Sequence, residues 1–274
     1  MLFRSMGDLC FIRSDCKSAI IHYSAAMECF DENAARAEMH RKIADSYEKL
    51  SDYDKAREEA AKGLDVLSGE DNPAEARLLM SIGRIQMRQG DYPCAIENLS
   101  KSASSAERHG SKSDLGMVEH LLGSVYLHKG EFPEARTHFE KAVAISTEIG
   151  DISGVAASQN NIGNVLARTG EWEKALEYYT TSCETDAKLG DKLGHASTLT
   201  NIASVHLSMG KPDDAIPILE KSIAIEKQIG DQRGLAISLI NLNMAYYLRG
   251  EYAKSIGILT EALDICEKNS LKYE

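Results

Sequence analysis

The stretch NNIGNVLARTGEWEKALEYY, residues 160–179, decides the fold because the chain repeats its pattern at a fixed interval. Forty residues later, at 200–219, the sequence reads TNIASVHLSMGKPDDAIPIL, and at 240–259 it reads INLNMAYYLRGEYAKSIGIL. Glycine permits the left-handed conformation that ends many helices, so regularly spaced glycines predict regularly spaced turns. Two interleaved series both step by 40 residues: Gly90, Gly130, Gly170, Gly210 and Gly250, and Gly110, Gly150, Gly190 and Gly230. Each 40-residue unit is therefore predicted to hold two helices and two turns.

Four columns of residues keep this register through seven repeats. The first column holds a small residue in all but the last repeat: Gly7, Ala44, Gly83, Gly123, Gly163, Ala203 and Asn243. A large aliphatic residue precedes it: Met6, Ile43, Ile82, Leu122, Ile162, Ile202 and Leu242. Twelve positions after it stands Ala19, Ala56, Ala95, Ala135, Ala175, Ala215 or Ser255, with a bulky residue three positions earlier in most repeats. Small residues let helices approach closely, and two helices cannot enclose a core alone, so the units must stack into a solenoid.

This pattern resembles the tetratricopeptide repeat (TPR), with its Leu-Gly-x-x-Tyr first helix and its Ala-x-x-x-Phe/Tyr second helix. The 40-residue period is similar to the long variety found in kinesin light chains, spindle-orienting G-protein adaptors and microbial signalling ATPases. The resemblance implies an all-α fold, a right-handed superhelical solenoid of antiparallel helix pairs with about seven TPR units. Departures at Pro212, Asn243 and Ser255 predict looser packing in the last two repeats. We expect one solenoid over residues 1–274, with repeats near 1–33, 34–72, 73–112, 113–152, 153–192, 193–232 and 233–274.

Both ends of the chain indicate a fragment of a longer protein. The first five residues, MLFRS, would be encoded by a GTG start followed by CTC TTC CGA TCT, which matches the end of a common sequencing adapter. We expect these residues to be an assembly artefact, the alternative being coincidence. The last five residues, SLKYE, begin where the next turn belongs, and no polar capping helix is predicted at either end. Because solenoids normally need caps, the uncapped ends can support self-association.

Composition narrows the function class. A formal net charge of −11 argues against a nucleic-acid partner, and no apolar run is long enough for a membrane span. Six cysteines without a C-x-x-C pair indicate reduced thiols and favour the cytoplasm. The sequence contains no phosphate-binding loop, nucleophile elbow or H-E-x-x-H motif, so we predict no enzyme, catalytic residue, cofactor or metal site. His120 and His128 lie two helical turns apart without a third ligand nearby in sequence.

The resemblance implies that the first helix of each repeat lines a concave groove. The inward positions then include an asparagine row: Asn161, Asn201 and Asn241, with Asn160 and Asn164 beside the first. A primary amide both donates and accepts hydrogen bonds, so such a row can hold an extended peptide backbone. The alternative is that these asparagines only help the helices to pack.

Basic residues form a second candidate surface in the groove. Arg77, Arg84 and Arg88 face inward in the third repeat, and Arg168, His120 and His128 continue that side. In the second repeat, Glu38, Asp45 and Glu48 are expected to neutralise the neighbouring basic residues, which leaves the third repeat as the cleaner basic surface. Arginines can bind carboxylates and attract an acidic partner, the alternative being an ordinary solvated face.

The sequence therefore predicts a non-catalytic interaction scaffold that binds a protein or peptide partner, of acidic character, in the groove. An alternative is the regulatory or sensory TPR region of a larger signalling protein such as an ATPase, a cyclase or a transcription regulator. A third interpretation is self-association through the ends. The apolar inner face of the last repeat, with Ile237, Ile240, Met244 and Tyr247, is either a binding pocket or a contact for residues further along a longer chain.

Overall fold

The computed structural model describes residues 2–68 and 70–268, and these form fourteen α-helices and no strand. Met1 and residues 269–274 lie outside this described part, so the expectations for the first residue and for SLKYE stay predictions. The helices are α1 Leu2–Ile12, α2 Cys16–Met27, α3 Asn33–Lys49, α4 Tyr53–Val66, α5 Ala74–Arg88, α6 Tyr92–Arg108, α7 Lys112–Lys129, α8 Phe132–Glu148, α9 Ile152–Arg168, α10 Trp172–Leu189, α11 Lys192–Ser208, α12 Pro212–Ile229, α13 Gln232–Leu248 and α14 Tyr252–Lys268. None of the described helices is both long and apolar enough to cross a membrane.

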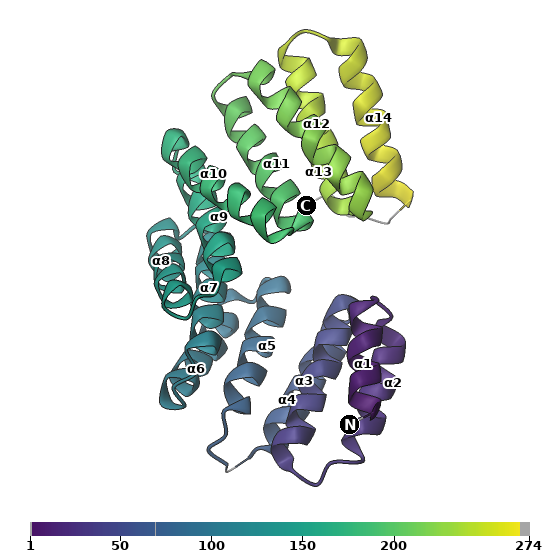
Figure 1. The fold of residues 1–274 in the computed structure, drawn as a ribbon, viewed down its shortest axis with the longest axis vertical. Helices are drawn as coiled ribbons and strands as arrows, with labels where there is room; N and C mark the ends of the chain where they lie inside the picture. Colours follow the sequence, from purple (N-terminus) through teal and green to yellow (C-terminus); the bar gives the residue numbers. More distant parts are fainter. Residues whose placement is uncertain (1, 69, 269–274) are drawn as a thin grey trace. The chain divides into compact units, whose positions relative to one another are not determined.

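Consecutive helices form antiparallel pairs, which confirms the all-α repeat prediction (Figure 1). The first helix of every pair begins within one residue of a predicted repeat start; α3, for example, begins at Asn33 and α11 at Lys192. Contacts are densest within a pair, such as α9 with α10, and continue to the next pair, such as α10 with α11. Within each unit, successive helix pairs therefore bury their apolar faces against one another, as stacked repeats must.

Most of the turns that follow the helices share one backbone conformation, with a residue of positive φ. All nine glycines of the two predicted series have positive φ, between 67° and 82°. In the first two repeats Ser14 and Ser51 take the same conformation with φ of 61° and 59°, although serine adopts it less readily than glycine. An aspartate then begins many of the next helices; Asp191 Oδ1, for example, accepts a hydrogen bond from the backbone N–H of Gly194 at 3.0 Å.

The small-residue column lies where two helices of one pair approach most closely. A Cβ atom added at Gly163 would stand 2.6 Å from Tyr179 Cε1, and one added at Gly123 would stand 2.7 Å from Phe139 Cδ1. Both rings are buried, so the glycine makes room for the ring of the second helix. Where the column holds Ala203, the partner is the smaller Leu219, which is also fully buried.

The departures from the repeat pattern in the last two repeats make local contacts, and looser packing there stays a prediction. The two polar departures in the last repeat meet each other, because Ser255 Oγ donates a hydrogen bond to Asn243 Oδ1. Pro212 takes the first position of α12, where a missing N–H costs nothing. Ala215, three residues further on, has no exposed surface.

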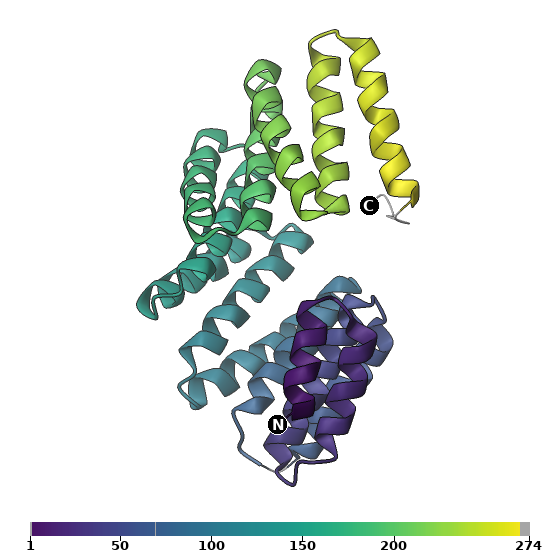
Figure 2. The same cartoon turned by 45° about the vertical axis from the view of Figure 1, so that its right-hand side comes forward.

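The chain divides into two compact units, residues 1–145 and 146–274. The first unit holds α1 to α7 and most of α8, and the second holds α9 to α14; Figure 2 shows α13 and α14 side by side in the second unit. On α14, Ile256 is 66% and Leu263 is 43% exposed, whereas the equivalent α12 residues, Ile216 and Ile223, are buried. Self-association through such faces stays a prediction, which sedimentation at several protein concentrations would check.

Candidate functional site

The predicted asparagine row lies in the second unit, on the first helices of three successive repeats, α9, α11 and α13. Because α11 packs against both α9 and α13, the three helices form one continuous face, called here the amide face. Asn160 Nδ2 donates to Thr198 Oγ1, and Asn201 Nδ2 donates to Asn160 Oδ1 at 3.2 Å. These bonds join α9 to α11, so this part of the row also holds two repeats together.

Asn164 is fixed from two sides. Its Nδ2 donates to Asn161 Oδ1 at 3.0 Å, and its Oδ1 accepts from Tyr179 Oη at 2.6 Å. Burial raises the pKa of Tyr179, which keeps its hydroxyl protonated and able to donate. The amides on α9 are therefore held in fixed orientations by the core beneath them.

The other end of the amide face keeps unused hydrogen-bonding capacity. Asn201 Oδ1 accepts no hydrogen bond, and Asn241, which is half-buried, has no hydrogen-bonding partner among the described residues. On α13, Ile237 and Met244 lie four before and three after Asn241, on the same side of the helix, and are 46% and 48% exposed. This end combines an open amide with accessible apolar side chains.

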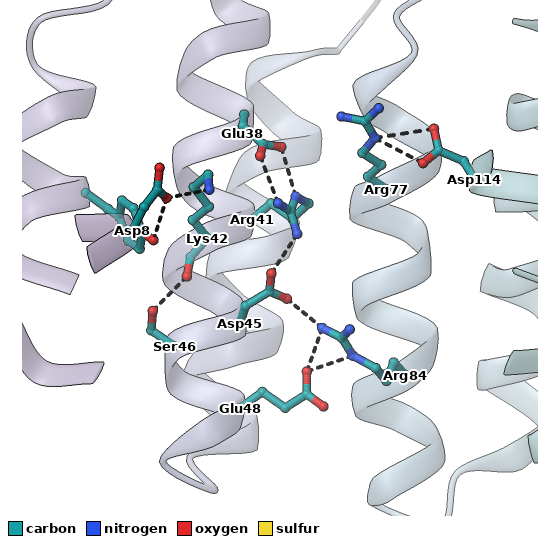
Figure 3. A network of polar contacts seen from close by, with 11 residues as sticks. Asp8, Glu38, Arg41, Lys42, Asp45, Ser46, Glu48, Arg77, Arg84 and Asp114 are labelled. Atoms are coloured by element: carbon teal, nitrogen blue, oxygen red, sulfur yellow. Dashed lines mark hydrogen bonds and ion pairs between the residues drawn. The ribbon is translucent and has the colours of Figure 1, made fainter. Parts of the chain in front are cut away.

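The basic surface in the first unit is paired with acids, which corrects the expectation of free positive charge in the third repeat. Arg84 Nε donates to Glu48 Oε2 at 2.9 Å, and its Nη2 contacts Asp45 Oδ1 (Figure 3). Arg88 Nε donates to Glu48 Oε1 at 2.7 Å. The carboxylates on α3 thus reach across to α5, whereas the sequence suggested that they would serve only the basic residues of their own helix.

The remaining members of this network are paired in the same way. Arg77 Nε lies 3.1 Å from Oδ1 of the buried Asp114 on α7, and Arg41 bridges Glu38 and Asp45 within α3 (Figure 3). Lys42 Nζ reaches Asp8 of α1 at 2.7 Å. The network, defined as Asp8, Glu38, Arg41, Lys42, Asp45, Glu48, Arg77, Arg84, Arg88 and Asp114, holds five carboxylates and five cations. Its formal charge is balanced, so it offers little attraction to an acidic partner.

The two predicted histidines lie in the first unit and make aromatic contacts. The His120 ring packs edge-on to Phe139 with centroids 5.5 Å apart, and burial lowers the pKa of His120, which favours the neutral ring. The exposed His128 stacks on Tyr92 at 6.4 Å. Among the described residues, no group of three His, Cys, Asp or Glu side chains is arranged to hold a metal ion.

Arg168, at the end of α9 in the second unit, is exposed and has no carboxylate partner in the described part of the chain. It is therefore the one predicted cation of the site that the structure leaves available. Of the predicted residues, hydrogen bonds join the four asparagines Asn160, Asn161, Asn164 and Asn201 in one array, in which Asn164 Nδ2 also donates to Asn160 Oδ1 at 3.5 Å. Arg84 and Arg88 are joined through Glu48. The two groups belong to different units.

A buried polar cluster that was not predicted from the sequence lies beside the amide face. Glu226 on α12 is only 2% exposed, and its Oε1 accepts from Ser238 Oγ at 2.9 Å and from Ser222 Oγ at 3.2 Å. Thr200 on α11 extends the cluster, at 2.9 Å from Ser222 Oγ and 2.8 Å from Ser238 Oγ. Burial, with the nearby Asp231 charge, raises the pKa of Glu226. The sequence does carry a signal for this cluster: small polar residues recur forty residues apart in otherwise apolar helices. The pairs are Ser182 with Ser222 and Thr198 with Ser238.

Sequence comparison identifies the repeat. A family model described as tetratricopeptide repeat matches residues 114–188 and 194–268, and a second with the same description matches residues 41–105. No curated protein sequence matches the chain.

Solved structures share the fold at low sequence identity. The apo form of RapI has a TM-score of 0.77 at 16% identity, over 99% of this chain and 98% of that one. The Rap conjugation gene regulator of plasmid pLS20, in complex with the Phr* peptide, has a TM-score of 0.73 at 20% identity, over 99% of this chain and 76% of that one. A signal transduction ATPase with a tetratricopeptide repeat sensor from Pyrococcus horikoshii has a TM-score of 0.74 at 16% identity, over 95% of this chain and 40% of that one. Likeness at these identities concerns the fold alone.

Proposed function

Because this chain belongs to the tetratricopeptide repeat family, we propose that it is a non-catalytic scaffold that binds a peptide segment of a partner protein. The peptide would lie along the amide face, with its backbone against Asn201 and Asn241 and with apolar side chains against Ile237 and Met244. The plasmid regulator that shares this fold was solved with a peptide, which makes a peptide the natural class of ligand to test.

The observation that carries the proposal is the unequal use of the amides. Asn160 and Asn164 make their hydrogen bonds to other residues of the protein, so their amides are already oriented before a ligand binds. Asn201 keeps an open carbonyl, and Asn241 keeps the whole amide. A ligand that meets groups already fixed in place loses less entropy on binding, so a preorganised row with unused ends suits peptide recognition.

The proposal that the scaffold is non-catalytic rests on how the reactive side chains are placed. Cys183 Sγ lies 3.3 Å from His195 Nδ1, the one cysteine–histidine contact among the described residues. The thiol is 8% exposed, and burial raises the pKa of Cys183, which disfavours the nucleophilic thiolate. We further propose a reducing compartment, the cytoplasm, because all six cysteines are free thiols.

Selection from a displayed library of random twelve-residue peptides, followed by calorimetry with synthetic peptides, tests the function. Asn201→Ala combined with Asn241→Ala should weaken a selected peptide about 5- to 150-fold, because two net hydrogen bonds of about 0.5–1.5 kcal/mol each are lost. Asn98→Ala, an amide on α6 of the first unit, is the matched control and should leave affinity unchanged. Equal affinity for the double variant and the wild type would exclude the amide face as the binding surface.

A second candidate function is the sensory region of a larger signalling protein. It is supported by the likeness to the Pyrococcus ATPase, in which the matching part is 40% of the chain. Long-read sequencing of the parent gene across both ends tests this. A nucleotide-binding or DNA-binding domain next to the repeats would favour the sensory function, and a start and a stop codon close to both ends would favour the free-standing scaffold.

A further inference from the structure

A pocket of about 350 Å³ opens beside the amide face, between α11, the end of α12 and the start of α13. It is within the usual range of ligand pockets, about 300–1,000 Å³. Its walls include the apolar side chains of Leu193 and Ile237, which are 56% and 46% exposed. Its polar lining includes Asn201 and the buried Glu226. The pocket therefore combines an apolar entrance with a polar interior.

Two acceptor atoms of this lining have no donor. Glu226 Oε2 is buried and has no hydrogen-bonding partner, while Asn201 Oδ1 accepts nothing from the described residues. A buried carboxylate oxygen without a donor is costly, about 1–3 kcal/mol or more, so structures rarely keep one without a reason. For the ionised carboxylate, the missing partner is a donor. Among the described residues, the lining holds two carboxylates, Glu226 and Asp231, against one cation, Arg233, so its formal charge is negative and favours a positively charged donor.

The geometry also decides which cation fits. Oε1 of Glu226 already accepts from Ser222 and Ser238, so only Oε2 lacks a hydrogen-bonding partner. A guanidinium binds carboxylates best through two parallel hydrogen bonds, which need both oxygens. An ammonium group is a compact donor with three N–H bonds, and one unpartnered carboxylate oxygen and an amide carbonyl in the same lining suit it. Its aliphatic stem would lie between Leu193 and Ile237.

From these contacts we infer that the pocket binds an alkylammonium group, the group carried by a lysine side chain or by a small aliphatic amine. The lysine source rests on the proposed function, since it makes the pocket the anchor point of a bound peptide. The free amine does not depend on it.

The preceding repeat offers a built-in comparison. Asp186 stands forty residues before Glu226, and its carboxylate is also buried, at 7% exposed. Its Oδ2 accepts from Thr198 Oγ1 at 3.5 Å, so this shorter acid is served by the protein itself. Asp186 is absent from the lining of the pocket. Asp186→Asn is therefore a matched control for Glu226→Gln, because it makes the same chemical change in the same place of another repeat.

The test is binding to the full chain at constant ionic strength, followed by calorimetry and by the methyl NMR signals of Leu193 and Ile237. There are two pairs of probes. The first is butylammonium chloride and its neutral counterpart 1-butanol; the second is the peptide acetyl-Gly-Lys-Gly-amide and its neutral counterpart, the same peptide with norleucine in place of lysine. We expect the two cationic probes to shift both methyl signals and the two neutral probes to leave them unchanged. Glu226→Gln should weaken the cationic probes at least tenfold, and Asp186→Asn should change their affinity less than twofold.

The outcomes separate this inference from the proposed function. Binding of butylammonium without the lysine peptide would support the pocket and count against a peptide ligand. Failure of both cationic probes would overturn the inference and indicate a bound water only, while the asparagine variants would still decide the proposed function. Equal binding to wild type and Glu226→Gln would also overturn it. Should Glu226→Gln not fold, Asn201→Leu serves instead, with a loss of at least threefold expected.

Discussion

A methyl group added at Gly163 should destabilise the protein, although alanine is the better helix former. The new Cβ would stand 2.6 Å from Cε1 and 2.7 Å from Cδ1 of Tyr179, well inside normal contact. Tyr179 is 2% exposed and its hydroxyl is bonded to Asn164, so the ring has little room to move. Overpacking of this kind costs about 1–3 kcal/mol, whereas alanine in place of glycine gains about 1 kcal/mol of helix propensity. The net expectation for Gly163→Ala is a loss of about 0–2 kcal/mol.

The chain supplies the control that separates the two contributions. Gly257 lies inside α14, and a Cβ there would meet nothing within 4 Å. Gly257→Ala should therefore stabilise by about 0.5–1 kcal/mol through propensity alone. Urea unfolding followed by circular dichroism, with amide exchange of α9 and α14 as the local measure, compares the two variants. The difference between them, about 1–3 kcal/mol, is the cost of the close approach to Tyr179.

A compensating change tests the same reasoning from the other side. Ala203 and Leu219 occupy the equivalent positions of the next repeat, and both are fully buried. Combining Gly163→Ala with Tyr179→Leu copies that pair, so the double variant should lose at least about 1 kcal/mol less than the sum of the single losses. Two results together would refute the claim that Gly163 makes room for the ring of Tyr179. The first is that Gly163→Ala stabilises the protein as much as Gly257→Ala does; the second is that the loss in the double variant equals the sum of the two single losses.

Two other changes should alter stability measurably. Glu226→Gln should stabilise the protein by about 1–3 kcal/mol at neutral pH and flatten the pH dependence of its stability. Burial raises the pKa of Glu226 in the folded protein, so the free energy of unfolding is highest below the unfolded-state pKa and falls as the pH rises through the folded-state pKa; urea titrations from pH 4 to pH 8 would detect this fall. Glu48→Gln should lower the free energy of unfolding by about 0.5–1 kcal/mol at low salt and by much less in 1 M NaCl, because salt screens its pairs with the partly exposed Arg84 and Arg88. Thermal unfolding at both salt concentrations measures this, with Glu97→Gln at an exposed ion pair as the control. A loss that does not depend on salt would contradict the prediction.

The sequence was sufficient for the repeats because their determinants are periodic and local. The left-handed glycines and the small-residue column recur every 40 residues, and each acts within its own helix pair. The use of Ser14 and Ser51 at the same turns was not predictable from residue type, since serine seldom adopts that conformation.

The candidate site was less predictable because its contacts cross between repeats. The sequence places Asp45 and Glu48 one turn from basic residues of their own helix, but α3 lies against α5, and the acids reach Arg84 and Arg88 there. The asparagines could be placed on one face, yet their mutual bonds depend on how closely α9 and α11 pack. Glu226 was overlooked because glutamate usually marks a solvated face, and only the surrounding serines show that this one is buried.

The equivalence of successive repeats has a consequence for how such a chain can change in length. Gly154, Gly194 and Gly234 each face the side chain at the same place of the preceding helix, namely Ser146, Asp186 and Glu226. Because these columns share one period, removal of residues 193–232 as a block would present Asp186 to Gly234, the same kind of contact that Asp186 now makes with Gly194. Gain or loss of whole 40-residue blocks therefore preserves the register of the stacked helices, while the binding surface changes by one repeat. Recombination between neighbouring repeats gives a gene of this kind a simple route to new partners without a new fold.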